Sequence, residues 1–376
     1  MKNRLLILLQ LMLIGAFSIG CEGTPDEQPN EGGDILEGSI SLVAQRSIVR
    51  ANGADAVEFS VLLSDNNGII HDVTADAEIY QTTSEEPLAE PRFATTTPGS
   101  YSFYACYGFE TSAEYEVSVV DGIVELPADP AVGSTDFAQR MLLIQHTGTA
   151  CTNCPAMMSK LKELSEEEEY KDLYYHVASH SYNTTNEGDP AYSKCAANLS
   201  RDELGVQGWP DLTFNLTTRR AYELEQMKSM IEMMHEDVAA VGVAASVVAV
   251  DGTIYTNVGV KAGKGGYYRV AVWILEDGIY AVQTGATMSW QNNHNNCLRD
   301  MAGENRTEQI YGSAIGTIEA GAAVENIYAV DVADNWEVEN CKALVIVTTA
   351  DAEGNLQLVN STVCKVGESV AYQYNK

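Results

Sequence analysis

The sequence predicts a multidomain α+β protein in which two β-rich segments flank a segment of alternating strands and helices. Residues 37–122 and 238–376 are short runs of β-branched and aromatic residues, separated by turn dipeptides such as Asn-Gly and Asp-Gly. Residues 123–237 instead alternate apolar runs with segments whose apolar residues recur at helical spacing. The fold class therefore follows from this change in period along the chain.

Residues 1–20 are typical of a secretory leader. Lys2 and Arg4 precede the apolar run "LLILLQLMLIGAF", which is too short for a membrane anchor. The run ends at "FSIGC", which resembles the lipobox of a bacterial lipoprotein signal peptide, in which Cys21 is acylated after cleavage. An ordinary signal peptide with an incidental cysteine is the alternative. Residues 21–36 predict an acidic flexible tether, similar to the surface-export signal of Bacteroidetes lipoproteins.

The formal net charge of −31 argues against nucleic acid as a partner and against direct binding to anionic lipid head groups. So acidic a protein is repelled by phosphate backbones and anionic head groups, so we expect no nucleic acid partner. Attachment to the outer membrane is expected through the N-terminal lipid, because no second apolar segment is long enough to span a bilayer. The protein would then face the periplasm or the cell surface.

The first β-rich segment, residues 37–122, predicts an Ig-like β-sandwich. Its strand candidates include "SISLVAQRSIV", "AVEFSVLLSD" and "GSYSFYACYG", several of which alternate with period two. The segment resembles bacterial Ig-like modules of surface proteins. We interpret it as a spacer rather than a binding module, because no chemically active residues are concentrated there.

Residues 123–237 predict a sheet with helices on its faces. The strand "RMLLIQHTG" leads through a loop into "CPAMMSKLKELSEE", where Pro155 fits the first turn of a helix. A second strand, "DLYYHVASHS", is followed by the helical "PAYSKCAANLSRDELG". A third strand, "PDLTFNL", precedes the closing helix "YELEQMKSMIEMMHEDV".

The last segment, residues 238–376, predicts a C-terminal β-sandwich, with strands such as "YYRVAVWILEDG" and "CKALVIVTTADAEGNLQLVNSTVCKV". It also contains "WQNNHNNCLRD" (residues 290–300), interpreted as an ordered loop or as a ligand or packing motif. The chain has eight cysteines, so seven remain beside Cys21 and at least one of them is unpaired. A pairing between two of Cys297, Cys341 and Cys364 is plausible.

Cys151 and Cys154 form a CxxC motif where a strand leads into a helix. The partial positive charge of a helix N-terminus stabilises a thiolate, which is the nucleophile in disulfide exchange. Cys151 lies nearer the loop and would be the attacking thiol. Cys154 lies inside the helix and would be the resolving thiol.

A second motif, "VQGWP" (residues 206–210), precedes the third strand. CxxC at the start of the first helix, followed by a loop with proline before a later strand, resembles the thioredoxin superfamily. The resemblance implies that Pro210 is a cis-proline beside the sulfurs and that the backbone of Trp209 pairs with a substrate peptide. Two departures weaken the match: Ala150 replaces the usual Trp, and Thr-Asn replaces the usual Gly-Pro between the cysteines.

A narrower resemblance covers most of residues 137–364. "HTGTACTNCP", "VQGWP", "HNNCLRDM", "ENCKALVIVT" and "LVNSTV" look like the Omp28-related outer membrane lipoproteins of Bacteroidetes. The resemblance implies a thioredoxin-like domain followed by a β domain, and it implies much less about activity.

Three hypotheses about function remain open. The first is thiol–disulfide exchange, carried by Cys151, Cys154 and Pro210, with Trp209 binding substrate. Its expected partners are protein disulfide substrates or other envelope proteins. The second is a non-catalytic surface or scaffold lipoprotein in which Cys151–Cys154 is a structural staple. The third is a copper or zinc site made by the two thiolates and one of three histidines, His146, His176 and His180. For each histidine a hydrogen-bonded structural role is more common, so neither a metal nor a cofactor is part of the expected site.

Overall fold

The structure is a computed structural model that describes residues 36–182 and 188–375. The predicted leader, Cys21 and nearly all of the tether lie outside the described residues. The chain divides into two compact units. One contains the described residues up to Ala44 with Phe59–Arg92 and Tyr101–Glu116, and the other contains Gln45–Glu58, Phe93–Ser100 and Val117–Lys376. The prediction of a multidomain, β-rich protein is confirmed at this level.

Strands between Gly38 and Val120 form two small sheets whose inner residues are apolar. Phe59 and Phe103, one from each sheet, pack with ring centroids 4.9 Å apart. The first sheet contains β1 (Gly38–Ala44), β3 (Val57–Asp65), β4 (Ile70–Asp72) and β6 (Arg92–Phe93). The second contains β2 (Ile48–Arg50), β9 (Tyr115–Val120), β7 (Gly99–Tyr107), β5 (Glu78–Gln81) and β8 (Glu110–Thr111).

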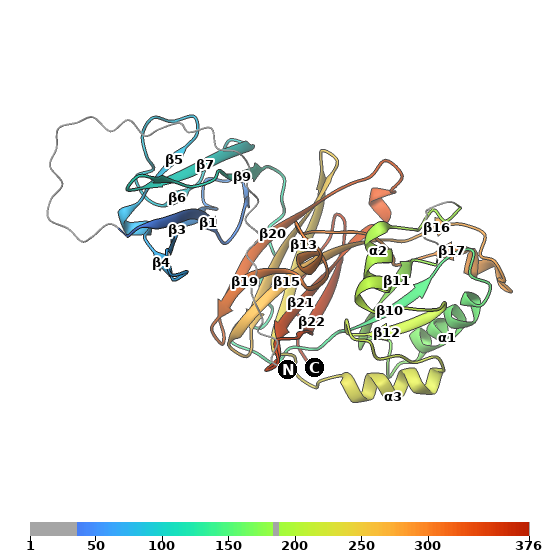
Figure 1. Ribbon diagram of the computed structural model, residues 1–376. Coiled ribbons are helices and arrows are strands. Elements are labelled where there is room, and N and C mark those ends of the chain that lie inside the picture. The colour runs from blue at the N-terminus through green and yellow to red at the C-terminus, as the bar shows by residue number, and fades with distance from the viewer. Residues whose placement is uncertain (1–35, 183–187, 376) are drawn as a thin grey trace, which may run out of the picture. The chain divides into compact units, whose positions relative to one another are not determined.

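An eight-stranded sheet runs through the second unit (Figure 1). Its order along the main path is β12-β10-β11-β18-β15-β21-β22, with β19 beside β15. Its strands are β12 (Asp211–Phe214), β10 (Met141–Thr147), β11 (Tyr174–His180), β18 (Cys297–Met301), β15 (Gly266–Glu276), β21 (Cys341–Ala350), β22 (Leu356–Lys365) and β19 (Ser313–Ile318). Segments 123–237 and 238–376, predicted as separate domains, therefore contribute strands to one sheet and belong to one compact unit.

Both faces of this sheet are covered, because alternate side chains of its strands enter different cores. Leu142 and Ile144 enter a core that includes Trp273 and Ile346 from the C-terminal half. Their neighbours Met141 and Leu143 pack on the other face, against α1 (Cys154–Glu166) and α3 (Leu224–Met234). Every residue of β10 is buried as a result.

The helices begin and end where local chemistry requires. Pro155 lies in the first turn of α1, as predicted, and Met157, Leu161 and Leu164 of that helix are buried. The hydroxyl of Ser193 caps α2 (Lys194–Asn198), which continues into a π-helical turn, Leu199–Glu203. In the described part of the chain, no helix combines the length and the hydropathy needed to cross a membrane.

The C-terminal half adds a four-stranded sheet that packs on β15 and β21 through a core of mainly valine and isoleucine side chains. Its order is β20 (Ala323–Asp331), β14 (Thr253–Ala262), β13 (Val241–Val250) and β23 (Ser369–Val370). Short elements fill the connections: β16 (Ile279–Tyr280), β17 (Asn293–His294), α4 (Arg306–Tyr311) and the 3₁₀ turns Thr74–Asp76, Ser289–Asn292 and Val338–Asn340.

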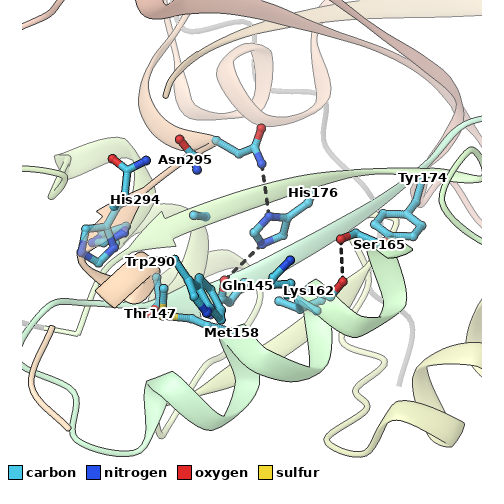
Figure 2. A pocket seen from close by; sticks show the side chains of 15 residues that line it. Gln145, Thr147, Met158, Lys162, Ser165, Tyr174, His176, Trp290, His294 and Asn295 are labelled. Atoms are coloured by element: carbon cyan, nitrogen blue, oxygen red, sulfur yellow. Dashed lines mark hydrogen bonds between the residues drawn. The ribbon is translucent and has the colours of Figure 1, made fainter. Parts of the chain in front are cut away.

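The face of β10 and β11 beneath α1 changes character along the strands. Near their beginning it presents Met141 and Leu143, which join the apolar core. Toward their end it presents Gln145, Thr147 and His180, which line a pocket together with residues of α1 and of segment 290–296 (Figure 2). The space between the sheet and α1 is therefore filled by apolar side chains near the start of the two strands and contains a pocket near their end.

Asn360 of β22 binds the backbone of the segment that leads into β10 and of the first residue of β13. Its side chain donates to the carbonyl oxygens of Ala138 (3.2 Å) and Val241 (2.8 Å) and accepts from the amide of Arg140 (2.8 Å). We predict that Asn360→Ala lowers the free energy of unfolding by about 3 kcal/mol, because buried backbone groups lose their partners. Urea denaturation measures this, and the exposed Gln357→Ala should stay within about 0.5 kcal/mol of wild type. Equal stability of the two variants would refute the role of Asn360.

His146 should make the fold acid-sensitive. It is fully buried, and burial first and the charge of Arg220 second lower its pKa to about 3. The unfolded state takes up a proton below about pH 6.5 and the folded state does not, so stability falls as the pH drops below that value. Between pH 7.5 and pH 4.5 the burial of His146 lowers the free energy of unfolding by about 2–3 kcal/mol. His146→Gln should flatten that part of the pH profile in denaturant titrations, and parallel profiles would contradict the assignment.

Candidate functional site

The two cysteines of the CxxC motif form a disulfide in which both side chains are buried. Cys151 is 1% exposed and Cys154 is fully buried. Strand β10 delivers the chain to the loop 148–153, and α1 begins at Cys154. The motif thus lies at a helix N-terminus, as predicted, but solvent does not reach the cysteine side chains.

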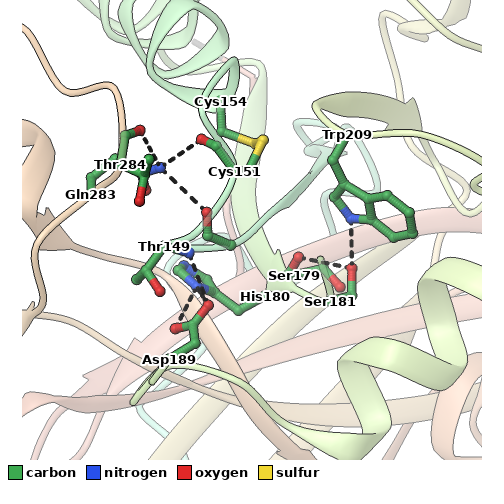
Figure 3. The surroundings of a disulfide bond; sticks show 11 residues. Thr149, Cys151, Cys154, Ser179, His180, Ser181, Asp189, Trp209, Gln283 and Thr284 are labelled. Carbon is green, nitrogen blue, oxygen red and sulfur yellow. Dashed lines mark hydrogen bonds and ion pairs between the residues drawn. A yellow bond between two sulfur atoms is a disulfide. The ribbon is translucent and has the colours of Figure 1, made fainter. Parts of the chain in front are cut away.

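A later segment of the chain covers this loop. We call residues 283–291 the cover segment. The buried side-chain amide of Gln283 donates to the carbonyl oxygens of Cys151 (2.9 Å) and Gly148 (3.3 Å). The amide of Thr284 donates to the carbonyl of Thr149 at 2.8 Å (Figure 3). Farther along, Gln291 donates to the carbonyl of Pro155 at 3.0 Å. The cover segment therefore binds the loop and the first turn of α1 through their backbone carbonyls.

Gly285 allows this close approach. Its φ of +78° lies in the left-handed region, and a Cβ at this position would overlap the carbonyl oxygen of Thr152. On its other side the loop is held by Asp189, whose carboxylate accepts from the amide of Thr149 at 2.9 Å. The loop that carries Cys151 is thus fixed from two directions.

The Trp209–Pro210 peptide is cis, as the motif implied. His146 near the end of β10 pairs with Asp211 at the start of β12. Pro210 and the CxxC loop therefore lie at the same end of these strands. The indole of Trp209 donates to the hydroxyl of Ser181 at 3.2 Å (Figure 3). Its ring contacts Tyr182 edge-on and lies 4.4 Å from the guanidinium carbon of Arg201. The half-buried indole is therefore engaged by its own chain.

The histidines proposed as metal ligands do not converge on the cysteines. His146 lies on the opposite face of the sheet from His176 and His180, and bonds the hydroxyls of Ser200 (2.7 Å) and Thr213 (3.0 Å). His176 bonds Gln145, and His180 bonds Asp189. Among the described residues, no three His, Cys, Asp or Glu side chains are grouped to hold a metal ion. The structure thus gives each of these histidines a structural partner.

The three cysteines of the C-terminal half do not form disulfides with one another. Cys297, Cys341 and Cys364 are buried free thiols, so the pairing considered among them does not occur. Burial raises the pKa of Cys341 to about 12 and that of Cys364 to about 11, which keeps both thiols protonated and unreactive.

Sequence patterns did not reveal Asp189, Gln283 or Gly285. Gln283 and Gly285 lie some 130 residues after the motif that they contact, in a segment that resembles an ordinary polar loop. The only available signal was "WQNNHNNCLRD", whose Trp290 and His294 line the pocket beneath α1.

Comparison with solved structures shows the fold of a large part of the chain. HBP35 of Porphyromonas gingivalis is similar with a TM-score of 0.50 and 15% identity, over 65% of this chain and 79% of that one. Domains 4–9 of the surface layer protein SbsC match 89% of this chain and 51% of that chain, with 13% identity and a TM-score of 0.18. Adhesin InvE of Yersinia pseudotuberculosis matches 87% of this chain and 58% of that chain, with 10% identity and a TM-score of 0.17. The last two carry no argument.

No curated protein matches the chain. The family model of outer membrane protein Omp28 matches residues 198–369, which include Trp209 and Pro210 and begin after Cys154. This match confirms the resemblance carried by "VQGWP" and the C-terminal motifs, and leaves the CxxC motif outside the matched range. Residues 198–369 of this chain are therefore similar to the Omp28 family of outer membrane proteins.

Proposed function

We propose that residues 123–237 form a thioredoxin-like unit within an envelope lipoprotein. The strand order β12-β10-β11, the parallel β10–β11 pair and the antiparallel β10–β12 pair support this. So does the placement of CxxC after β10 and of Pro210 before β12. After β12 the chain makes an isolated antiparallel bridge between Thr213 and Arg220 before it reaches α3.

We further propose that the Cys151–Cys154 bond is structural and that the protein acts without redox turnover. The observation that carries this conclusion is the burial of both cysteines, which belong to a loop and a helix start held in place by Gln283, Thr284 and Asp189. Exchange needs an in-line approach of one sulfur to another, and the covered loop offers none. The disulfide would then fix the CxxC loop on which the cover segment rests.

Thiol–disulfide exchange is the second candidate function, favoured by the position of Pro210 at the same end of the strands as the CxxC loop. In this mechanism the reduced Cys151 thiolate attacks a substrate disulfide, forms a mixed disulfide and releases one substrate thiolate. Cys154 then attacks Cys151, which releases the second substrate thiol and re-forms the Cys151–Cys154 bond. Trp209 and Pro210 would dock the substrate peptide. This function requires the cover segment to move away.

We propose that the chain is attached to the outer membrane by an acyl group on Cys21. The similarity to the Omp28 family supports an outer membrane location, and the leader "LLILLQLMLIGAFSIGC" supports acylation. Residues 21–36 would act as the tether and residues 37–122 as an Ig-like spacer. Nucleic acid is not a partner in this proposal, because the net charge is −31.

Both proposals depend on the cover segment, which protects the Cys151–Cys154 disulfide from reduction. We predict that Gly285→Ala displaces the cover segment and speeds reduction of Cys151–Cys154 by dithiothreitol about tenfold or more, because protection by local structure is lost. Thiol alkylation followed by mass spectrometry measures the rate. Gly354→Ala is the matched control, since Gly354 has a similar φ of +87° with no atom near its missing Cβ. Gln283→Ala should act like Gly285→Ala, and unchanged rates in both variants would refute the covering role.

Insulin reduction by the full chain in detergent then separates structural from catalytic use of the bond. The structural proposal expects equal rates for wild type and Cys151→Ser, and a reduction potential of the pair below about −300 mV. A rate that depends on Cys151, with a potential between about −270 and −120 mV, would establish exchange instead.

Acylation is tested by metabolic labelling with radioactive palmitate in a bacterium that processes lipoproteins. Wild type should incorporate label and sediment with membranes, because acyl chains supply the apolar contact with the bilayer. Cys21→Ser should lose both properties. Label retained in Cys21→Ser would show that the lipid lies elsewhere.

A further inference from the structure

A cavity of about 490 Å³ lies beneath α1, on the polar part of the sheet (Figure 2). This volume suits a small organic molecule. Strands β10 and β11 form its floor, and residues from α1 and from segment 290–296 form its walls. The lining residues are Gln145, Thr147, Met158, Leu161, Lys162, Ser165, Tyr174, His176, Ala178, His180, Trp290, Asn293, His294, Asn295 and Asn296.

Four buried polar atoms on the floor lack a hydrogen-bond partner within the described residues. They are Nε2 of Gln145, Oγ1 of Thr147, the phenolic oxygen of Tyr174 and Nε2 of His180. All four side chains are more than nine-tenths buried. An unpaired buried polar atom costs about 1–3 kcal/mol, so native proteins rarely leave one, and four around one cavity point to a missing occupant.

The neighbours of Gln145 determine which of its atoms is left over. Burial lowers the pKa of His176 to about 4, so its ring is neutral. Its Nδ1 accepts from the amide of Asn296 at 3.3 Å, which leaves Nε2–H to donate to Oε1 of Gln145 at 3.1 Å. The NH₂ group of Gln145 is therefore an unused donor. The phenol of Tyr174 is a second donor, because burial raises its pKa to about 12 and keeps it protonated.

His180 adds a donor with positive charge. Its Nδ1 donates to the carboxylate of Asp189 at 3.0 Å. Burial alone would lower the pKa of His180, but the sulfur of Cys297 and the carboxylate of Asp189 raise it to about 10. The ring is thus protonated at neutral pH. Its Nε2 has no partner by hydrogen-bond geometry among the described residues, although the side chain of Cys297 lies close enough to interact with the ring. The cavity floor offers hydrogen-bond donors and a cation.

The walls complete a site for an anion with an apolar body. None of the fifteen lining residues is acidic, although the chain has 53 Asp and Glu against 22 Lys and Arg. Met158, Leu161 and Trp290 supply the apolar wall, and exposed Lys162 lies at the mouth, 5.9 Å from the Trp290 ring. Lys162 pairs with Glu166, and His180 pairs with Asp189, so each cation already has a carboxylate partner and an anion would be held mainly by the unpaired donors of the floor.

We propose that this cavity binds a small organic carboxylate whose apolar or aromatic body lies against Trp290 and Met158. Its carboxylate would accept from Nε2 of His180, the hydroxyl of Thr147 and the NH₂ group of Gln145. Charge-assisted hydrogen bonds in a cavity without acids select an anion over its neutral amide. The proposal is independent of whether the disulfide exchanges, and it gives "WQNNHNNCLRD" a role as the outer wall of a ligand site.

Isothermal titration calorimetry of the full chain in detergent tests the proposal, with phenylacetate, 4-hydroxybenzoate and indole-3-acetate as probes. At least one should bind saturably, and at least tenfold more tightly than its carboxamide. The double variant Thr147→Val/Tyr174→Phe should weaken that binding at least tenfold without lowering the melting temperature, because it removes the Thr147 contact to the carboxylate and a second lining hydroxyl, both of which lack a partner among the described residues. Tyr175→Phe is the matched control, because Tyr175 lies on the opposite face of β11 and packs in the other core.

Each other outcome overturns the proposal. If none of the three carboxylates binds, ordered water alone fills the cavity. Equal binding of a carboxylate and its amide would remove the role of His180. Binding that persists in the double variant would place the ligand elsewhere. A double variant with a markedly lower melting temperature would show that the two hydroxyls serve the fold.

Discussion

The placement of β18 between β11 and β15 is the constraint on which the second unit depends. Ala178 of β11 pairs with Cys297 in parallel, and the amide of Ala178 donates to the carbonyl of Asn296 at 2.8 Å. On its other side β18 pairs with β15 in antiparallel register. This one strand joins the α/β part of the chain to the C-terminal sandwich, so the two halves share the core around Leu142, Trp273 and Ile346.

The route of the chain into β18 explains the two features that matter most for function. Between the end of β15 at Glu276 and the start of β18 at Cys297, the connection passes over the first turn of α1. Its first part contains Gln283 and Gly285 and lies on the CxxC loop. Its second part contains Trp290 and His294 and forms a wall of the cavity. One long connection therefore covers the loop that carries the disulfide and forms one wall of the neighbouring cavity.

Local patterns predicted the parts of the site that are local. The CxxC motif at a helix start, the proline loop and the strands around them follow from spacing and period. The metal hypothesis failed to use strand parity: His146 pairs with Ser179, so its side chain shares a face with that residue and not with His176 or His180. The same alternation in "QHT" and "YYHVASH" could have placed Gln145, Thr147, His176 and His180 on one face. The burial of Cys151 could not be predicted, because the groups that cover it come from a distant connection with no local signal of its own.

The shared sheet also bears on how such proteins can be inherited. A chain that ended after α3 would leave β11 as an open strand edge, and Leu142 and Ile144 would lose Trp273 and Leu275 as neighbours. Open edges of this kind pair with other chains and cause aggregation. Recombination that separated the α/β half from the trailing sandwich would therefore expose the edge of β11 and the apolar residues of the shared core.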